Sequence, residues 1–215
     1  SLRPAGALTP TSVTREEPSG RLDFARDIAS PNNPLTARVM VNRIWLHLLG
    51  EGLVPTPDDF GFNGTPPTHP ELLDHLALEF IDHGWSIKQI IREIVLSRTY
   101  GQGVSSEALA LERDAGNQRY HSARVRRLSG EVLRDSMLQI SGRLDRKQFG
   151  PSVPAYVSDL MQGRGRPASG PLDGQGRRSI YIEIRRNFLS PWMLVFDTPA
   201  PFSTMGKRSR SNVPA

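Results

Sequence analysis

The sequence contains no cysteine. This absence excludes disulfide bonds, thiolate metal ligands, thiol nucleophiles and haem attachment through a Cys-x-x-Cys-His motif. No run of residues approaches the roughly 18 consecutive apolar positions that a membrane-spanning helix needs. The first residues do not show the basic and then apolar pattern of a secretory signal peptide. We therefore expect no membrane span and no thiol-based site.

Apolar residues make up only 37% of the 215 positions, whereas proline and glycine occur 18 and 19 times. A chain of this length buries a substantial core, but so many prolines and glycines interrupt regular structure. The composition predicts a mainly α fold in which helices are joined by long irregular loops.

Charge is distributed unevenly along the chain. Residues 1–118 carry 10 basic and 15 acidic side chains, and residues 119–215 carry 17 basic and 7 acidic ones. This difference leads to two hypotheses. In the first, the opposite charges favour docking of the two halves against each other; in the second, the basic half binds a polyanion. The second hypothesis would use the basic residues Arg124, Arg126, Arg127, Arg134, Arg143, Arg146 and Lys147. No nucleic-acid motif accompanies them, so nucleic acid is a disfavoured partner.

The stretch from Asn33 to Gly50 has the pattern of a central helix. Asn33 suits the N-cap, Pro34 the first helical position and Gly50 the position after the end. With about 100° between successive residues, the apolar side chains cover most of the helix circumference. This pattern predicts a helix buried on nearly all sides.

Arg38 and Asn42 lie one turn apart inside that apolar arc. An enclosed guanidinium requires a carboxylate or several carbonyl groups, because an unpaired buried charge is strongly destabilising. We predict that Arg38 and Asn42 form a structural polar core. Asp58 and Asp59 are the nearest acidic candidates for Arg38 or Arg43; alternatively, both aspartates cap turns.

Further helices are predicted over 21–29, 68–83, 86–96, 105–113 and 129–141. Thr68 and Glu71 have the spacing of a capping box, and Ser86 with Gln89 repeats it. Alternating isoleucines in 178–186 indicate a half-buried strand. The predicted fold is thus a mainly α, loop-rich helical domain with one small β element.

We expect four parts along the chain. Residues 1–20 would be an extended arm or linker, 21–160 a helical core, 161–177 a flexible Gly/Pro loop, and 178–215 a strand and C-terminal segment packing on the core.

Two groups of side chains are candidates for chemistry. Asp58, Asp59, His69 and Glu71 would suit acid–base catalysis or a divalent cation, although Glu71 is also a capping residue. His69 does not pair at zinc-ligand spacing with another histidine, and we predict neither a metal nor a cofactor.

The second group consists of arginine pairs that flank the predicted strand: Arg177, Arg178, Arg185 and Arg186. Such pairs clamp a carboxylate or sulfate. The structural alternative is that Arg185 pairs with Asp197 or Asp59 while Arg186 faces water.

Several spaced blocks resemble one known family. They are Asn33–Trp45, Thr56–Gly61, His69–Asp74, Gly84–Ser86, Leu96–Tyr100, Arg127–Asp135, Gly150–Val153, Arg177–Tyr181 and Phe196–Asp197. Together, over residues 20–215, they resemble the planctomycete-specific domain of unknown function 1553, which occurs C-terminal to cytochrome C-like domains. The resemblance implies an exported, extracytoplasmic protein of the periplasm or cell envelope, here a truncated copy, and it supplies no catalytic residues.

The resulting hypothesis is an interaction or scaffolding module of a larger envelope protein. Its expected partners are other domains of the parent polypeptide, with an acidic polysaccharide as a second candidate. One alternative is a hydrolase-like enzyme acting on a carbohydrate or sulfated polymer. The other is a polyanion- or nucleic-acid-binding protein that uses the basic second half.

Overall fold

The computed structural model describes residues 20–105, 108–199, 201–202 and 204–208. The fold is mainly helical and rich in loops, as predicted. The chain divides into two compact units, with unit 1 ending at Val125 and unit 2 beginning at Arg126. In the part of the chain that is described, no helix is long and apolar enough to cross a membrane.

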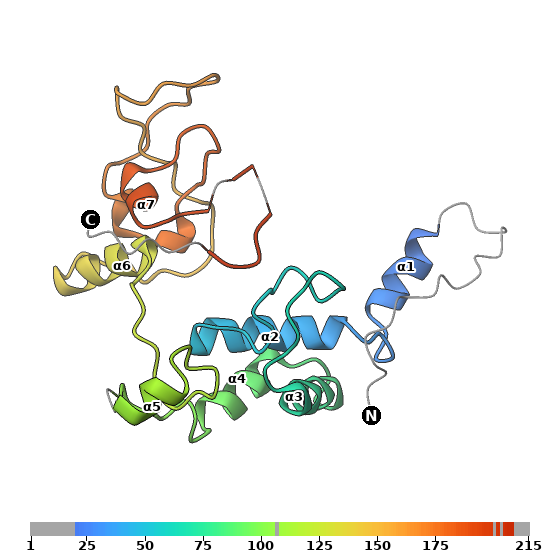
Figure 1. Cartoon of the computed structure of the whole chain (residues 1–215). Helices are drawn as coiled ribbons and strands as arrows, with labels where there is room; N and C mark the ends of the chain where they lie inside the picture. The colour runs from blue at the N-terminus through green and yellow to red at the C-terminus, as the bar shows by residue number, and fades with distance from the viewer. Residues whose placement is uncertain (1–19, 106–107, 200, 203, 209–215) are drawn as a thin grey trace. The chain divides into compact units, whose positions relative to one another are not determined.

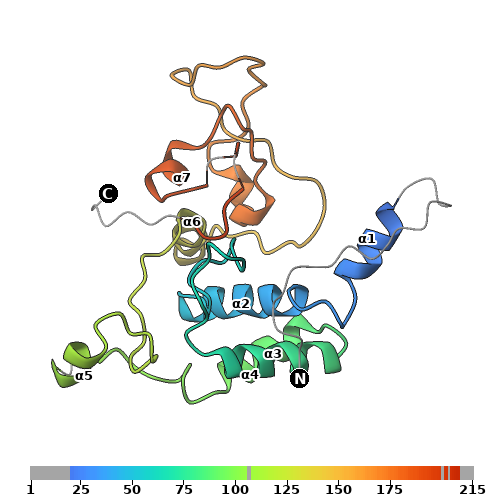
Figure 2. The same cartoon turned by 45° about the vertical axis from the view of Figure 1, so that its right-hand side comes forward.

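Unit 1 is built on three helices that contact one another: α2 (Thr36–Leu49), α3 (Pro70–Asp82) and α4 (Ile87–Val95). Figures 1 and 2 show α3 lying alongside α2. The core consists of their apolar faces together with a few loop residues, of which Leu53, Val54 and Tyr120 are buried. Two shorter helices, α1 (Arg21–Ile28) and α5 (Ala108–Arg113), contribute no buried residue.

The central helix begins slightly later than its sequence pattern indicates. Asn33 Oδ1 accepts hydrogen bonds from the backbone N–H groups of Leu35 and Thr36, at 2.9 and 3.2 Å, so Asn33 stabilises the entry turn from outside the helix. Pro34 lies in this turn, and α2 starts at Thr36. At the other end, Gly50 adopts the left-handed conformation, with φ of 91°, that glycine accommodates best.

The capping box predicted before α3 does not form. The hydroxyl of Thr68 donates to the carbonyl oxygen of Leu53 at 3.2 Å, and His69 takes the N-cap position without a side-chain cap. Glu71 is therefore exposed in the first turn rather than used as a cap. The second predicted cap is confirmed, because Gln89 N–H donates to Ser86 Oγ at 3.3 Å.

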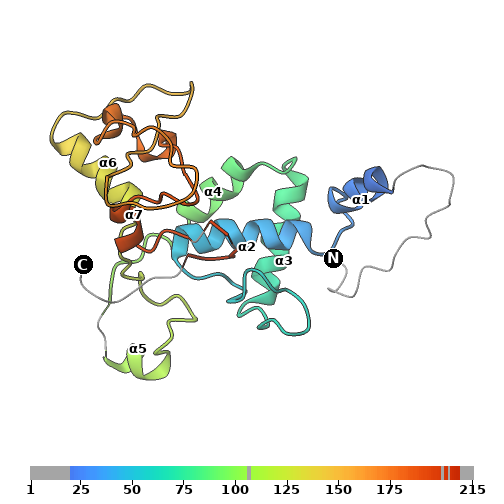
Figure 3. The same cartoon turned by 90° about the horizontal axis from the view of Figure 1, so that it is seen from above.

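Unit 2 contains α6 (Gly130–Ile140), the 3₁₀ turns η1 (Gly174–Gly176) and η2 (Ser179–Tyr181), and α7 (Pro191–Val195). Helix α6 contacts both η2 and α7, and Figure 3 shows α6 and α7 close together. These contacts place α6 in unit 2. The division between the two units falls after Val125.

No strand forms at 178–186, where the sequence predicted one. Residues 179–181 form η2 instead, and only isolated bridges follow, including a parallel bridge between Val153 and Ile182. A 3₁₀ turn has about three residues per turn and breaks the two-residue alternation. As a result, Ile180 and Ile184 are 77% and 76% exposed instead of half-buried.

The Gly/Pro segment 161–177 has two different parts. Residues 163–166 are exposed, as expected of a surface loop. Gly174, Gly176 and Arg177 are buried, because this end of the segment docks beside residues 143–145 through a hydrogen bond from Asp145 N–H to the carbonyl oxygen of Gly176.

Candidate functional site

Arg38 is enclosed within unit 1, with 8% of its side chain exposed. Its Nε donates to Asp74 Oδ1 at 2.6 Å, and its Nη1 donates to the carbonyl oxygen of Pro34 at 2.7 Å. Asp74 lies on α3, one helix away, so this charge-assisted pair joins α2 to α3. Asp74 is thus a carboxylate partner of Arg38 that lies on another helix.

Asn42 is completely buried and holds the proline-rich segment that follows α2. Its Nδ2 donates to the carbonyl oxygen of Val54 at 3.1 Å, and Val54 N–H donates to its Oδ1 at 2.9 Å. A β-carbon on Gly52 would lie 2.6 Å from the Val54 carbonyl oxygen and 2.9 Å from the Asn42 amide. Only glycine fits between them.

Asp58 and Asp59 are engaged within unit 1. Asp58 Oδ1 lies 3.8 Å from Nη2 of Arg43, a long ion pair between two exposed side chains. Asp59 Oδ1 accepts from Gly61 N–H at 2.8 Å, which is the turn-capping alternative. His69 contacts Thr68 Oγ1 at 3.0 Å. Across the described residues, no group of three or more His, Asp and Glu side chains is arranged to hold a metal ion.

A hollow of about 360 Å³ opens beside the Arg38–Asp74 pair. Its walls come from the proline-rich segment, and Phe62, which is fully exposed, stands at its edge. Of the four acid–base candidates, none lines this hollow.

The four candidate anion-binding arginines lie in unit 2 and differ in their surroundings. Arg177 is buried: its Nη2 donates to the carbonyl oxygen of Phe149 at 3.0 Å, and its guanidinium lies 4.3 Å from the centre of the Tyr181 ring. Arg178 has its Nε 3.8 Å from a carboxylate oxygen of Asp135.

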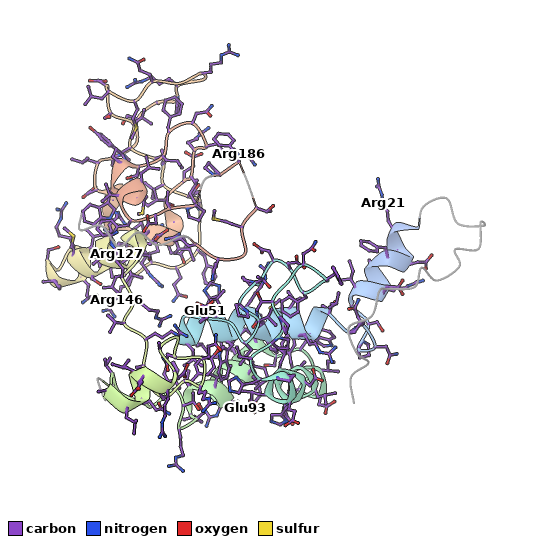
Figure 4. All side chains as sticks on the ribbon, viewed as in Figure 1. Arg21, Glu51, Glu93, Arg127, Arg146 and Arg186 are labelled. Carbon is purple, nitrogen blue, oxygen red and sulfur yellow. The ribbon has the colours of Figure 1, made fainter. Side chains whose placement is uncertain are left out.

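The other two arginines are exposed. Arg185 pairs at 2.9 Å with Glu183, two positions away, in place of the expected Asp197 or Asp59. Asp197 lies 3.8 Å from Arg127. Arg186 is exposed, as the structural alternative predicted, and is labelled in Figure 4. The structure therefore does not gather these four arginines into one clamp.

A cavity of about 420 Å³ in unit 2 brings Arg185, one of the candidate arginines, together with other charged residues that the sequence analysis did not group with it. Apolar side chains from Ile182, Phe188 and Met193 form much of its lining. Three arginines and two glutamates also line it: Arg134, Arg185, Arg208, Glu131 and Glu183.

Glu131 and Arg208 form a two-pronged pair at one side of this cavity. Arg208 Nη1 and Nη2 each donate to a different carboxylate oxygen, both at 2.8 Å. These hydrogen bonds from Arg208 lower the pKa of Glu131 from 4.5 to about 2, against the opposing effect of burial. Glu131 is accordingly ionised at neutral pH and has no proton to give.

Arg134 has a different environment. Its guanidinium donates to the carbonyl oxygens of Arg177 at 2.9 Å and Asp173 at 2.6 Å, and to Ser179 Oγ at 3.1 Å. Burial lowers the pKa of Arg134 because it removes the charged form from water, and the nearby carboxylates of Asp135 and Asp173 oppose this shift. One sequence signal points to this site: Glu131 and Arg134 are three residues apart and therefore share a face of α6.

A family model described as PSD1, protein of unknown function (DUF1553), matches residues 20–215. No curated protein and no solved structure matches the chain.

Proposed function

We propose that this chain, which belongs to the family of proteins of unknown function DUF1553, is an interaction or scaffolding module of a larger exported envelope protein. The observation that carries the proposal is that several of the charged side chains that would otherwise do chemistry are paired within the chain. Asp59 caps a turn, and Arg185 pairs with Glu183. A hydrolase needs an acid and a base available to its substrate, whereas these groups are engaged in holding loops.

Exposed apolar side chains near the end of unit 2 support an interacting role. Leu194 and Val195 on α7 are about half exposed, and Phe202 is 71% exposed. Large apolar side chains exposed to water are available for association with other proteins. The partners that fit this proposal are other domains of the parent polypeptide in the periplasm or cell envelope, with an acidic polysaccharide as the second candidate.

A binding measurement with two matched variants tests the proposal. The chain is titrated by calorimetry with the remaining domains of the parent protein, expressed separately. Leu194→Glu and Phe202→Glu should each weaken binding at least about tenfold, because a charge is then buried in the interface. Leu160→Glu, at another strongly exposed apolar position of unit 2, should bind normally. Equal binding by all variants, or no binding by the unaltered chain, would contradict the proposal.

The alternative of a hydrolase-like enzyme acting on a carbohydrate or sulfated polymer has less support. The carboxyl groups with shifted pKa values in the described residues, Asp114 and Glu131, are both shifted downwards. A general acid requires the opposite shift. Release of reducing ends or sulfate from dextran sulfate by the purified chain would revive this alternative.

The alternative of polyanion binding draws on the charge of unit 2, in which residues 126–215 carry 15 basic and 7 acidic side chains. Phosphate- or sulfate-driven binding weakens steeply with salt. A heparin column run over a salt series measures it directly: retention that falls as salt rises supports this alternative, and absence of retention even at low salt removes it.

A further inference from the structure

The cavity of unit 2 has the size and lining of a small-molecule site. At about 420 Å³ it lies within the usual range for such sites, which combine mostly apolar walls with a few converging polar groups. Its apolar lining comes from segments far apart in sequence, including Pro154, Leu172, Ile182 and Met193. A ligand with an apolar body would therefore be enclosed from several sides.

The two carboxylates in the lining are already neutralised. Both oxygens of Glu131 accept from Arg208, and Glu183 Oε1 lies 2.9 Å from Nη2 of Arg185. These two pairs leave little net charge at their positions. The remaining charged residue of the lining, Arg134, decides the sign of the electrostatic potential inside the cavity.

Arg134 has hydrogen-bonding capacity that the described residues do not use. Its Nη groups donate to two backbone carbonyls and one hydroxyl, and its closest carboxylate contact, with Asp135, is a long 3.4 Å. The carboxylate of Asp135 is shared with Ser179, which donates to it from both its backbone N–H and its hydroxyl, at 2.8 and 2.7 Å. The Nε–H of Arg134 has no acceptor among the described residues.

This arrangement leaves next to an apolar cavity a guanidinium whose nearest carboxylate, that of Asp135, is 3.4 Å away and also accepts hydrogen bonds from Ser179. The Arg134 side chain is 19% exposed, so water does not fully solvate the guanidinium. A ligand anion would give the guanidinium a closer carboxylate partner, and the apolar walls would hold the body attached to it.

We propose that the unit 2 cavity binds a small organic anion, with an apolar body against the apolar lining and an anionic group at Arg134. This site goes beyond the proposed interaction role and does not depend on it, because the cavity is formed by unit 2 alone. Its selectivity follows from charge: an uncharged ligand of the same shape fills the cavity but places no negative charge beside Arg134.

The test uses 4-phenylbutyrate as the anionic probe and 4-phenylbutyramide as its uncharged counterpart. Both are titrated into the whole chain at neutral pH and low salt, and binding is followed by two-dimensional NMR of the backbone amides. We expect the acid to shift the amide signals of Ser179, Glu183 and Ile184. We expect it to bind about tenfold more tightly than the amide, since a hydrogen bond to a charged group is stronger than one to a neutral group.

A pair of matched variants distinguishes an effect on ligand binding from an effect on folding. Replacing Arg134 would also remove its hydrogen bonds to the 173–179 segment, so the informative change is Ile184→Glu, which adds a negative charge at an exposed position of the lining. Ile180→Glu is the control, because Ile180 is equally exposed but lies outside the lining. Ile184→Glu should weaken binding of the acid several-fold and leave binding of the amide nearly unchanged, while the control should bind both like the unaltered chain.

Three outcomes would overturn the proposal. The first is equal binding of the acid and the amide, and the second is identical behaviour of the two variants. The third is that no signal of the cavity residues shifts up to about 10 mM probe, which corresponds to negligible affinity. The proposed interaction role fails separately, through the Leu194 and Phe202 variants, neither of which lies in this lining.

Discussion

At the scale of single residues, Asn42 shows how one side chain organises a loop without regular structure. Its amide satisfies both backbone groups of Val54 and has no exposed surface. The proline-rich segment after α2 has few other means of pairing its backbone, since proline lacks an N–H group. The Asn42 side chain therefore makes the backbone hydrogen bonds that a neighbouring strand would make in a sheet.

We predict that Asn42→Ala destabilises unit 1 by about 2–4 kcal/mol. The change leaves the N–H and C=O groups of Val54 buried without partners, and each such group is worth about 1–3 kcal/mol. Urea unfolding followed by the fluorescence of buried Trp45 measures the loss. Asn63→Ala, in an exposed loop, is the control and should unfold like the unaltered chain. Equal midpoints for both variants would contradict this role of Asn42.

Glu131 predicts a pH dependence of stability at the acidic end. Its pKa is about 2 in the folded chain and 4.5 as a reference value for the unfolded one. A lowered pKa means that the ionised carboxylate stabilises the fold at pH values above 4.5, and this contribution is lost as the pH falls from 4.5 towards 2. Because the group is partly solvated, we discount the full linkage value to about 1–2 kcal/mol.

The measurement is urea unfolding of unit 2, followed by Trp192 fluorescence, at several pH values across this window. Glu131→Gln should remove this part of the pH dependence and lower stability at neutral pH. A variant that keeps the full acid sensitivity of the unaltered chain would show that other carboxyl groups are responsible.

At the scale of elements, the contact between α6 and α7 depends on a residue without a side chain. Trp192 Nε1 donates to the carbonyl oxygen of Gly130 at 3.0 Å. A β-carbon at Gly130 would lie 3.1 Å from both Met193 Sδ and Phe196 Cβ. The sulfur end of Met193 is flexible, but Phe196 Cβ is attached directly to the backbone and moves only with α7.

Gly130→Ala should therefore destabilise unit 2 by about 1 kcal/mol, even though alanine is the better helix former by a similar amount. Trp192 fluorescence should also change, because its hydrogen bond to α6 is displaced. Ser136→Ala on the exposed face of α6 is the matched control and should be neutral or slightly stabilising. A stabilised Gly130→Ala variant with unchanged fluorescence would show that α7 accommodates the methyl group.

At the scale of the whole molecule, each unit contains its own interior. The buried cluster around Val41, Phe80 and Ile90 draws every member from unit 1. The networks around Arg134 and Arg177 are made of residues of unit 2. A segment with its own core and its own hydrogen-bond networks is the usual definition of a domain that folds by itself.

We predict that a fragment of residues 20–125 folds alone. Its backbone amide NMR spectrum should superimpose on the corresponding signals of the whole chain, and it should unfold cooperatively in urea. Asn42→Ala in the fragment should give the same loss of stability as in the whole chain. A fragment without dispersed signals or a cooperative transition would show that unit 1 requires the rest of the chain.

What the sequence determined by itself was local. Helical periodicity placed Arg38 and Asn42 in an apolar arc, and both are buried in the structure. The Ser86 cap and the left-handed Gly50 also follow from residues a few positions apart. Such patterns are readable because a helix repeats every few residues, so neighbours in sequence report directly on which face is apolar.

Only the tertiary structure decided which distant groups meet. Arg38 pairs with Asp74, 36 positions away, and residues 178–186 form a 3₁₀ turn and isolated bridges instead of a strand. Arg134 donates hydrogen bonds to the 173–179 segment, about 40 positions further along the chain. These pairings depend on how α3 and the 173–179 loop pack in space, and no periodicity in the sequence encodes that distance. The residues of the candidate cavity therefore became visible together only once the chain was folded.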